Sequence, residues 1–131
     1  MYRVVEGPVS AQEVVAQVRP SDAHGALVTF VGSLRGRSAD GRQVLRGRCH
    51  TGQGSGEGHL ARIEADIRAR WHLEAISLCH RTGDIAVGDT VFVAAVAAPH
   101  RPEAFAACQY AIDRVKEVFV LEEEVVEGGA A

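Results

Sequence analysis

The stretch GDTVFVAAVAAPHRPEAFAACQYAIDRVK, residues 88–116, joins a long apolar run to an alanine-rich amphipathic segment. Its first part is rich in valine and follows a Gly-Asp turn, a pattern that predicts a buried strand. Pro102 and Glu103 suit the first turn of a helix, because proline fits the first helical position and a carboxylate favours the positive helix end. The spacing predicts one buried stripe on this helix, made of Phe105, Cys108, Ile112 and Val115.

Strand-like and helix-like segments alternate along the rest of the chain. Ser10 and Glu13 form a capping-box pattern that predicts a first helix, and a second helical period begins at Leu60. Strands are expected within residues 2–6, 25–36, 44–49, 75–83, 88–101 and 117–126. This order favours an α+β fold with a mixed sheet and about three helices, in a single domain spanning residues 1–131.

Glycine marks two segments that are expected to be flexible. Residues 51–59 contain GQGSGEG, which lacks the GxxxxGK[ST] pattern of a phosphate-binding loop and is typical of a mobile connection. Residues 125–131 contain Gly128 and Gly129 followed by two alanines, and we expect them to form a frayed tail.

Composition places the chain among ordinary globular proteins. It is 47% hydrophobic and 24% charged with a net charge of -3, which argues against a general nucleic-acid binder. No apolar run is long enough to span a membrane, and the N-terminal residues lack a signal-peptide pattern. Cys49, Cys79 and Cys108 form no CxxC pair, so a reducing, cytoplasmic location is expected.

Two arginine-containing segments could bind an anion. His100 and Arg101 stand at the junction of strand and helix, where backbone N–H groups and a guanidinium attract phosphate or carboxylate. Arg35 and Arg37 follow an expected strand and lie on a loop, where binding residues are often presented. A capped turn and solvated surface arginines would explain the same residues without a ligand.

Lys116 is the only lysine, since the 14 basic residues comprise it and 13 arginines. A cation near a helix end interacts favourably with the helix dipole, which is the simplest interpretation. Lysine also loses its proton more readily than arginine when partly buried, and it then serves as a base or nucleophile. Lys116 lies roughly 22 Å along a helix from Arg101, so a shared site would have to extend along the helix or collect groups from another element or subunit.

A metal site is not expected. Cys49, His50, His59, Cys79 and His80 are zinc-type ligands, but their spacing matches no zinc finger or knuckle. Adjacent residues on a strand also point to opposite faces, which separates the two members of each Cys-His pair.

Two blocks of sequence carry a more specific pattern. They are FVGSLRGRSADGRQV, residues 30–44, and CHRTGDIAVGDTVFVAAVAAPHRPEAFAACQYAIDRVKE, residues 79–117. The pattern comprises Phe-x-Gly-x-x-Arg, His-Arg-x-Gly, a Gly-Asp turn, a His-Arg pair and a helix ending Asp-x-x-Lys. Its positions here are Phe30, Gly32, Arg35, His80, Arg81, Gly83, Gly88, Asp89, His100, Arg101, Asp113 and Lys116. Together these blocks resemble the catalytic, large subunit of molybdopterin synthase, the MoaE family.

The resemblance implies a sulfurtransferase of molybdenum cofactor biosynthesis with an α/β-hammerhead-like fold. Family enzymes take up a small ubiquitin-like sulfur carrier whose C-terminal Gly-Gly bears a thiocarboxylate. They deliver two sulfur atoms to cyclic pyranopterin monophosphate, which gives the dithiolene of molybdopterin. The large subunit forms a homodimer with one small partner at each end, a heterotetramer. The pattern calls for no cofactor, metal, nucleic acid or membrane.

The resemblance also implies the site residues. The catalytic residues would be Lys116, His100 and Arg101, and the substrate-binding residues would be Arg35, Phe30 and Arg37. Arginines suit the phosphate oxygens of the substrate, a histidine suits proton transfer, and a lysine suits a base or transient nucleophile.

Two segments depart from the family pattern. The family continues to a second active-site lysine, whereas this chain has three glutamates at residues 122–124. A bulky, acidic family strand is replaced by GRCHTG, residues 47–52, and Arg46 or Arg48 could offset the missing lysine. An alternative is therefore a catalytically impaired relative that acts as a binding or scaffolding subunit for the sulfur carrier. A generic anion-binding domain is a third possibility.

Overall fold

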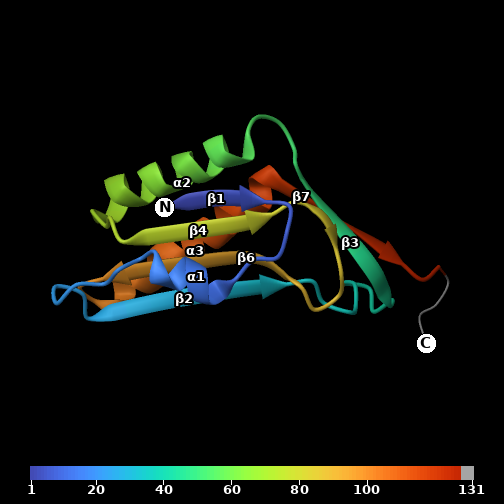
Figure 1. Ribbon diagram of the computed structural model, residues 1–131, viewed down its shortest axis with the longest axis horizontal. Coiled ribbons are helices and arrows are strands. Elements are labelled where there is room, and N and C mark those ends of the chain that lie inside the picture. The colour runs from blue at the N-terminus through green and yellow to red at the C-terminus, as the bar shows by residue number, and fades with distance from the viewer. Residues whose placement is uncertain (128–131) are drawn as a thin grey trace.

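The computed structural model describes residues 1–127, which form two β-sheets and three helices (Figure 1). The larger sheet has four strands in the spatial order β1 (Tyr2–Val5), β4 (Ile76–Arg81), β6 (Thr90–Ala98) and β2 (Ala26–Ser33). β1 and β4 run parallel and the other neighbours antiparallel, so the predicted mixed sheet and α+β class are confirmed.

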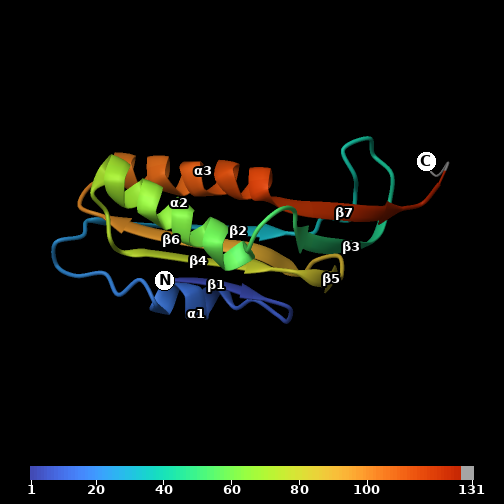
Figure 2. The ribbon, with the colours of Figure 1, turned by 90° about the horizontal axis from the view of Figure 1, so that it is seen from above.

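Helices cover both faces of this sheet (Figure 2). α2 (Gly56–Trp71) and α3 (Arg101–Val118) lie on one face, and α1 (Ala11–Ala16) lies on the other. Alternate residues of β6 join two apolar clusters, Phe92, Ala94, Val96 and Ala98 on the α2–α3 side and Val93, Ala95 and Ala97 on the α1 side. Burial on both sides explains why this strand reads as an unbroken apolar run.

A second, three-stranded antiparallel sheet extends from one end of the larger sheet, and we call it the arm (Figure 1). Its strands are β5 (Gly83–Ile85), β3 (Val44–Thr51) and β7 (Phe119–Val125), with β3 in the middle. β7 follows α3 directly, because Val118 ends the helix and Phe119 already has extended backbone angles. The tail thus forms the edge strand that its alternating sequence predicts.

The helix that follows the glycine-rich segment begins earlier than predicted. α2 starts at Gly56 rather than at Leu60, because Ser55 caps it by accepting a hydrogen bond from the Gly58 N–H at 3.2 Å. Only the first half of the predicted loop 51–59 is therefore non-helical. The short β5 was also missed, since its three residues are too few to show a strand period.

The predicted buried stripe of α3 is wrong at one position. Phe105 is 61% exposed, while the face of α3 against the sheet consists of Ala104, Ala107, Cys108, Ala111 and Val115. Small residues let the helix approach β6 closely, and a phenylalanine one position from that face is left outside.

The first helix cap and the C-terminal tail can be compared with their predictions. The capping box is confirmed at its first half, since Ser10 Oγ accepts a hydrogen bond from the Glu13 N–H at 3.2 Å. β7 runs to Val125, and most of the predicted tail, residues 128–131, lies outside the described residues. Within residues 1–127, no helix is long and apolar enough to cross a membrane.

Candidate active site at the seam of the two sheets

A cavity of about 260 Å³ opens where the arm joins the larger sheet, and we call it the seam cavity. Its lining comes from both sheets and from the last turns of α3. The lining residues are Phe30, Gly32, Ser33, Cys49, His80, Val91, Phe92, Ile112, Val115, Lys116, Phe119 and Leu121. The seam cavity is therefore an apolar hollow with four polar side chains.

Phe30 and Lys116 meet at this cavity, although they stand far apart in the sequence. Phe30 lies on the inward face of β2, and its ring centroid is 6.2 Å from that of Phe92. Lys116 lies in the last turn of α3 and is exposed, next to the buried Val115. The neighbouring Glu117 pairs with Arg114, and within residues 1–127 Lys116 forms no ion pair of its own.

His80 forms the buried floor of the cavity on β4. Its ring is stacked on Phe119, with centroids 3.9 Å apart and planes at 9°, and it lies 5.5 Å from Phe92. Nδ1 lies 2.7 Å from the Arg81 carbonyl oxygen and 3.9 Å from Cys49 Sγ. Since a carbonyl only accepts hydrogen bonds, Nδ1 carries the proton of the neutral ring.

Burial fixes the protonation states of this pair. It lowers the pKa of His80 to about 4, against the opposing hydrogen bond to the Arg81 carbonyl. It raises the pKa of the Cys49 thiol to about 11. At neutral pH the cavity floor therefore holds a neutral imidazole and a protonated thiol, and Lys116 supplies the positive charge.

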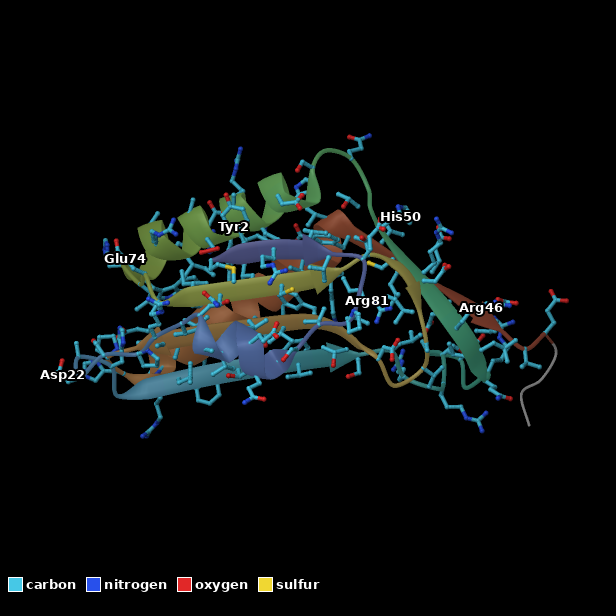
Figure 3. All side chains as sticks on the ribbon, in the orientation of Figure 1. Tyr2, Asp22, Arg46, His50, Glu74 and Arg81 are labelled. Carbon is cyan, nitrogen blue, oxygen red and sulfur yellow. The ribbon has the colours of Figure 1, made fainter. Side chains whose placement is uncertain are left out.

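The glutamates of β7 are divided between the two faces of the arm. Glu122 pairs with Arg48 in the strand register, and Glu124 pairs with Arg46. Arg46 also forms an ion pair with Glu124, and His50 Nε2 lies 3.3 Å from Glu122 Oε1. Figure 3 shows Arg46 and His50 on the protruding arm, at the opposite end of the molecule from Asp22 and Glu74.

Glu123 lies on the other face of β7. It is paired with Gly47, on the same face as Cys49 and Leu121, which line the seam cavity. Arg46 and Arg48 do not line the seam cavity and share a separate hollow with Glu123, so the hypothesis that either offsets a missing lysine stays a prediction. The negative charge of Glu123 has no arginine partner on its own face of β3.

The structure places His100 and Arg101 away from the seam cavity. They stand at the first turn of α3, in a separate hollow that also includes Gly25 and Pro99. Both side chains are exposed, and His100 Nδ1 lies 3.8 Å from Glu103 Oε1. The length of α3 separates them from Lys116, so a single chain does not bring these three residues together.

Arg35 and Arg37 lie on the loop between β2 and β3 and are exposed. Arg35 comes two residues after Ser33, which lines the seam cavity. Arg37 donates a hydrogen bond to the Gly41 carbonyl at 3.4 Å and forms a bridge with Gln43. The loop thus holds Arg37 in a turn, and Arg35 follows the cavity end of β2 with an exposed side chain.

Cys49 and His80 are the site residues that sequence reasoning missed. Both appear among the zinc-type ligands, but within residues 1–127 no three such side chains gather closely enough to hold a metal ion. The His-Arg-x-Gly turn was the available signal for His80. No sequence signal predicted that Cys49 would lie next to His80, because this proximity depends on the packing of the arm against β4.

Comparisons with known proteins show the family of this chain. A sequence model of the family described as "MoaE protein" matches residues 4–118. The molybdopterin synthase catalytic subunit of Halalkalibacterium halodurans is 33% identical over 117 residues, covering 89% of this chain and 74% of that protein. The subunit of the same name from Vibrio cholerae is 37% identical over 106 residues, covering 81% of this chain and 69% of its own.

Solved structures show the same fold. The crystal structure of molybdopterin synthase from Staphylococcus aureus has a TM-score of 0.83 at 28% identity and covers 95% of this chain and 91% of that one. A complex of subunits 1 and 2 of the Helicobacter pylori molybdopterin-converting factor has a TM-score of 0.73 at 13% identity, covering 98% and 87%, and shows the fold alone. The family match runs from β1 through the end of α3, which leaves only β7 of the arm outside it, and this chain belongs to the MoaE family.

Proposed function

We propose that this protein is the catalytic subunit of a molybdopterin synthase and transfers sulfur to cyclic pyranopterin monophosphate. One observation carries the proposal: Phe30 and Lys116, from the two separate blocks of the family pattern, line one cavity. The relatives named as molybdopterin synthase catalytic subunits support the same reaction. The three cysteines are buried and unpaired, which supports a cytoplasmic location.

In this proposal a small sulfur-carrier protein supplies the sulfur through a C-terminal Gly-Gly thiocarboxylate. The Lys116 ammonium meets the anionic thiocarboxylate or the developing negative charge when sulfur attacks carbon. Phe30 packs against the flat pterin, and Arg35 and Arg37 bind the phosphate oxygens. Attack by the thiocarboxylate sulfur displaces oxygen from carbon as water, with protons from nearby donors, and leaves a thioester between the carrier and the pterin. A second water hydrolyses this thioester, which leaves the sulfur on the pterin and returns the carrier as its carboxylate.

His100 and Arg101 fit the proposal only through a second subunit. In one chain they lie at the far end of α3, so we place them at the seam cavity of the other protomer in a homodimer. With one small partner at each end, the assembly would be a heterotetramer. A monomeric native mass for the purified protein would contradict this arrangement.

The deciding experiment mixes purified protein with a thiocarboxylated small partner and cyclic pyranopterin monophosphate. The dithiolene product is oxidised to a fluorescent pterin and compared with a control that lacks this protein. Product above the control is expected. Absence of product, under conditions where a relative such as the Halalkalibacterium enzyme is active, would contradict the catalytic role.

A second candidate function rests on Glu123, which places a negative charge on the cavity face of β7. The chain would then be an impaired relative that binds the sulfur carrier without turnover. Glu123→Lys separates the two functions, with Glu124→Lys on the opposite face as its control. Activity that appears only in Glu123→Lys supports the impaired relative, whereas an active wild-type protein supports the enzyme.

A further inference from the structure

The second nitrogen of His80 has no role in holding the fold. The side chain is only 4% exposed, and its Nδ1–H is directed to the Arg81 carbonyl at 2.7 Å. Nε2 therefore carries a lone pair and can accept a hydrogen bond. Within residues 1–127 no donor lies within hydrogen-bond distance of it, and the residue lines the seam cavity.

His80 Nε2 is not among the fully buried, unpaired side-chain atoms of residues 1–127, and the residue lines the seam cavity, so water or a ligand can reach this nitrogen. A ligand that displaces that water must replace its hydrogen bond, because the loss of water is otherwise uncompensated. The His80 ring cannot turn to find another partner, since Phe119 is stacked on it and the Arg81 carbonyl holds Nδ1. The orientation of the ring is thus fixed, and Nε2 is the nitrogen of this cavity-lining residue that is left to meet a ligand.

We infer that His80 contacts the substrate of the seam cavity, with Nε2 accepting a hydrogen bond from a neutral N–H or O–H donor while Lys116 meets the anionic group. This inference rests on the proposed function and adds a substrate-contacting residue to it. Two sources offer such a donor: the ring N–H groups of the pterin, and the backbone amides of the sulfur carrier's glycine tail. Both present a donor next to an anion, as the cavity requires.

Neighbouring groups support an acceptor rather than a donor at this position. Cys49 lies on the Nδ1 side of the ring, and burial keeps its thiol protonated. The low pKa of His80, about 4, keeps the imidazole neutral under physiological conditions. Phe92 and Phe119 offer no competing hydrogen bond in the ring plane.

Three substitutions separate the hydrogen bond from the stacking. His80→Asn keeps an N–H close to the position of Nδ1 and removes the acceptor at Nε2. His80→Gln reaches the position of Nε2 with an amide oxygen, and His80→Phe keeps only a flat ring. Cys79→Ala is the matched control, because Cys79 is buried on the adjacent position of β4 and packs in the other apolar cluster.

In the sulfur-transfer assay, we expect His80→Asn and His80→Phe to lower kcat/KM at least tenfold, on the order of one lost hydrogen bond. His80→Gln should recover part of that loss, and Cys79→Ala should match wild type. A purely structural role predicts another order, in which His80→Phe keeps wild-type kcat/KM because the stack remains. That order would overturn the inference.

A binding readout that needs no turnover uses ¹⁵N NMR of histidine-labelled protein, with the His80 signals assigned by their loss in His80→Asn. Cyclic pyranopterin monophosphate and the small partner in its carboxylate form are added separately. A change in the Nε2 signal with either probe supports the inference and identifies the donor's source. An unchanged signal with both overturns it. Wild-type inactivity bears on the proposed function alone, since this readout does not depend on product.

Discussion

The four-stranded sheet and the arm differ in how their strands are buried. β6 in the larger sheet is buried on both faces, and its side chains alternate between two apolar clusters. β3 in the arm buries Val44, Gly47 and Cys49 on one face and exposes charged residues on the other. The larger sheet is therefore stabilised by packing, whereas the outer face of the arm depends on cross-strand charges. The seam cavity lies where the two meet.

The largest expected effect concerns Lys116, at the end of the helix that joins the two sheets. Lys116→Ala should lower sulfur-transfer activity by about 100-fold or more, because one preorganised charge at a reacting centre contributes on that order. The side chain is exposed, so the melting temperature should stay close to wild type. Glu117→Ala is the control at the next position. Wild-type turnover in Lys116→Ala would remove this residue from the mechanism.

Truncating one leucine in each sheet compares how much the packing of the two sheets contributes to stability. Leu78 on β4 is 0% exposed, and Leu78→Ala should lower the free energy of unfolding by about 2–5 kcal/mol through the cavity it leaves. Leu45 on β3 is 49% exposed, and Leu45→Ala should cost less than about 0.5 kcal/mol. Urea unfolding measures both. Equal costs would show that the arm packs as tightly as the larger sheet.

The pH dependence of stability reports the buried histidine at the seam. The His80 pKa falls from its ordinary value of 6.5 to about 4 on folding, so the unfolded chain binds a proton more readily. The stability linked to this group is fully present above pH 6.5 and is lost as the pH falls to about 4. The expected loss is on the order of 2–3 kcal/mol.

Unfolding at pH 7 and pH 4.5 tests this prediction with His80→Phe as the comparison. The groups around the ring are Cys49, the Arg81 carbonyl, Phe92 and Phe119, and of these side chains only the thiol titrates. Lys116 and Glu123, on the cavity side, are unchanged in the variant. The variant should lose less stability than wild type over this interval. An identical loss would assign the pH dependence to carboxylates elsewhere.

The smallest effect is expected on the outer face of the arm. Arg46→Ala removes the ion pair with Glu124, and it should lower the melting temperature less than Leu78→Ala does. The difference from wild type should shrink further in 1 M salt, because exposed charges are screened over roughly 3 Å at that concentration. A double-mutant cycle with Glu124→Ala isolates the pair. Coupling that resists salt would mean that this face is covered in solution.

Local patterns predicted much of the larger sheet and little of the arm's interior. The turn, strand and helix of residues 88–116 are confirmed because an unbroken apolar run and a proline-led helix start are local signals. Phe105 was misplaced because hydrophobicity alone favours burying a phenylalanine over an alanine. Because α3 packs closely against β6, alanines occupy the contact face and Phe105 is left exposed. This close packing can be seen only in the folded structure.

The candidate site divides in the same way. Lys116, Phe30 and Arg35 were predicted from short motifs, and the first two line the seam cavity. His80 and Cys49 are neighbours because β5, which follows β4 after one residue, pairs with β3 and sets Cys49 opposite Gly83, a pairing that the divergent GRCHTG segment concealed. The register of β7 also determines on which face of the arm each glutamate lies. A shift of one residue would exchange the faces of Glu122 and Glu123.

The direct junction between α3 and β7 has a consequence for partner binding. No residue separates Val118, which ends α3, from Phe119, which begins β7. The edge strand of the arm, the Phe119 ring stacked on His80 and the helix end that bears Lys116 therefore belong to one continuous segment. A protein that binds β7 would contact the same segment that supplies Lys116 and Phe119 to the cavity wall.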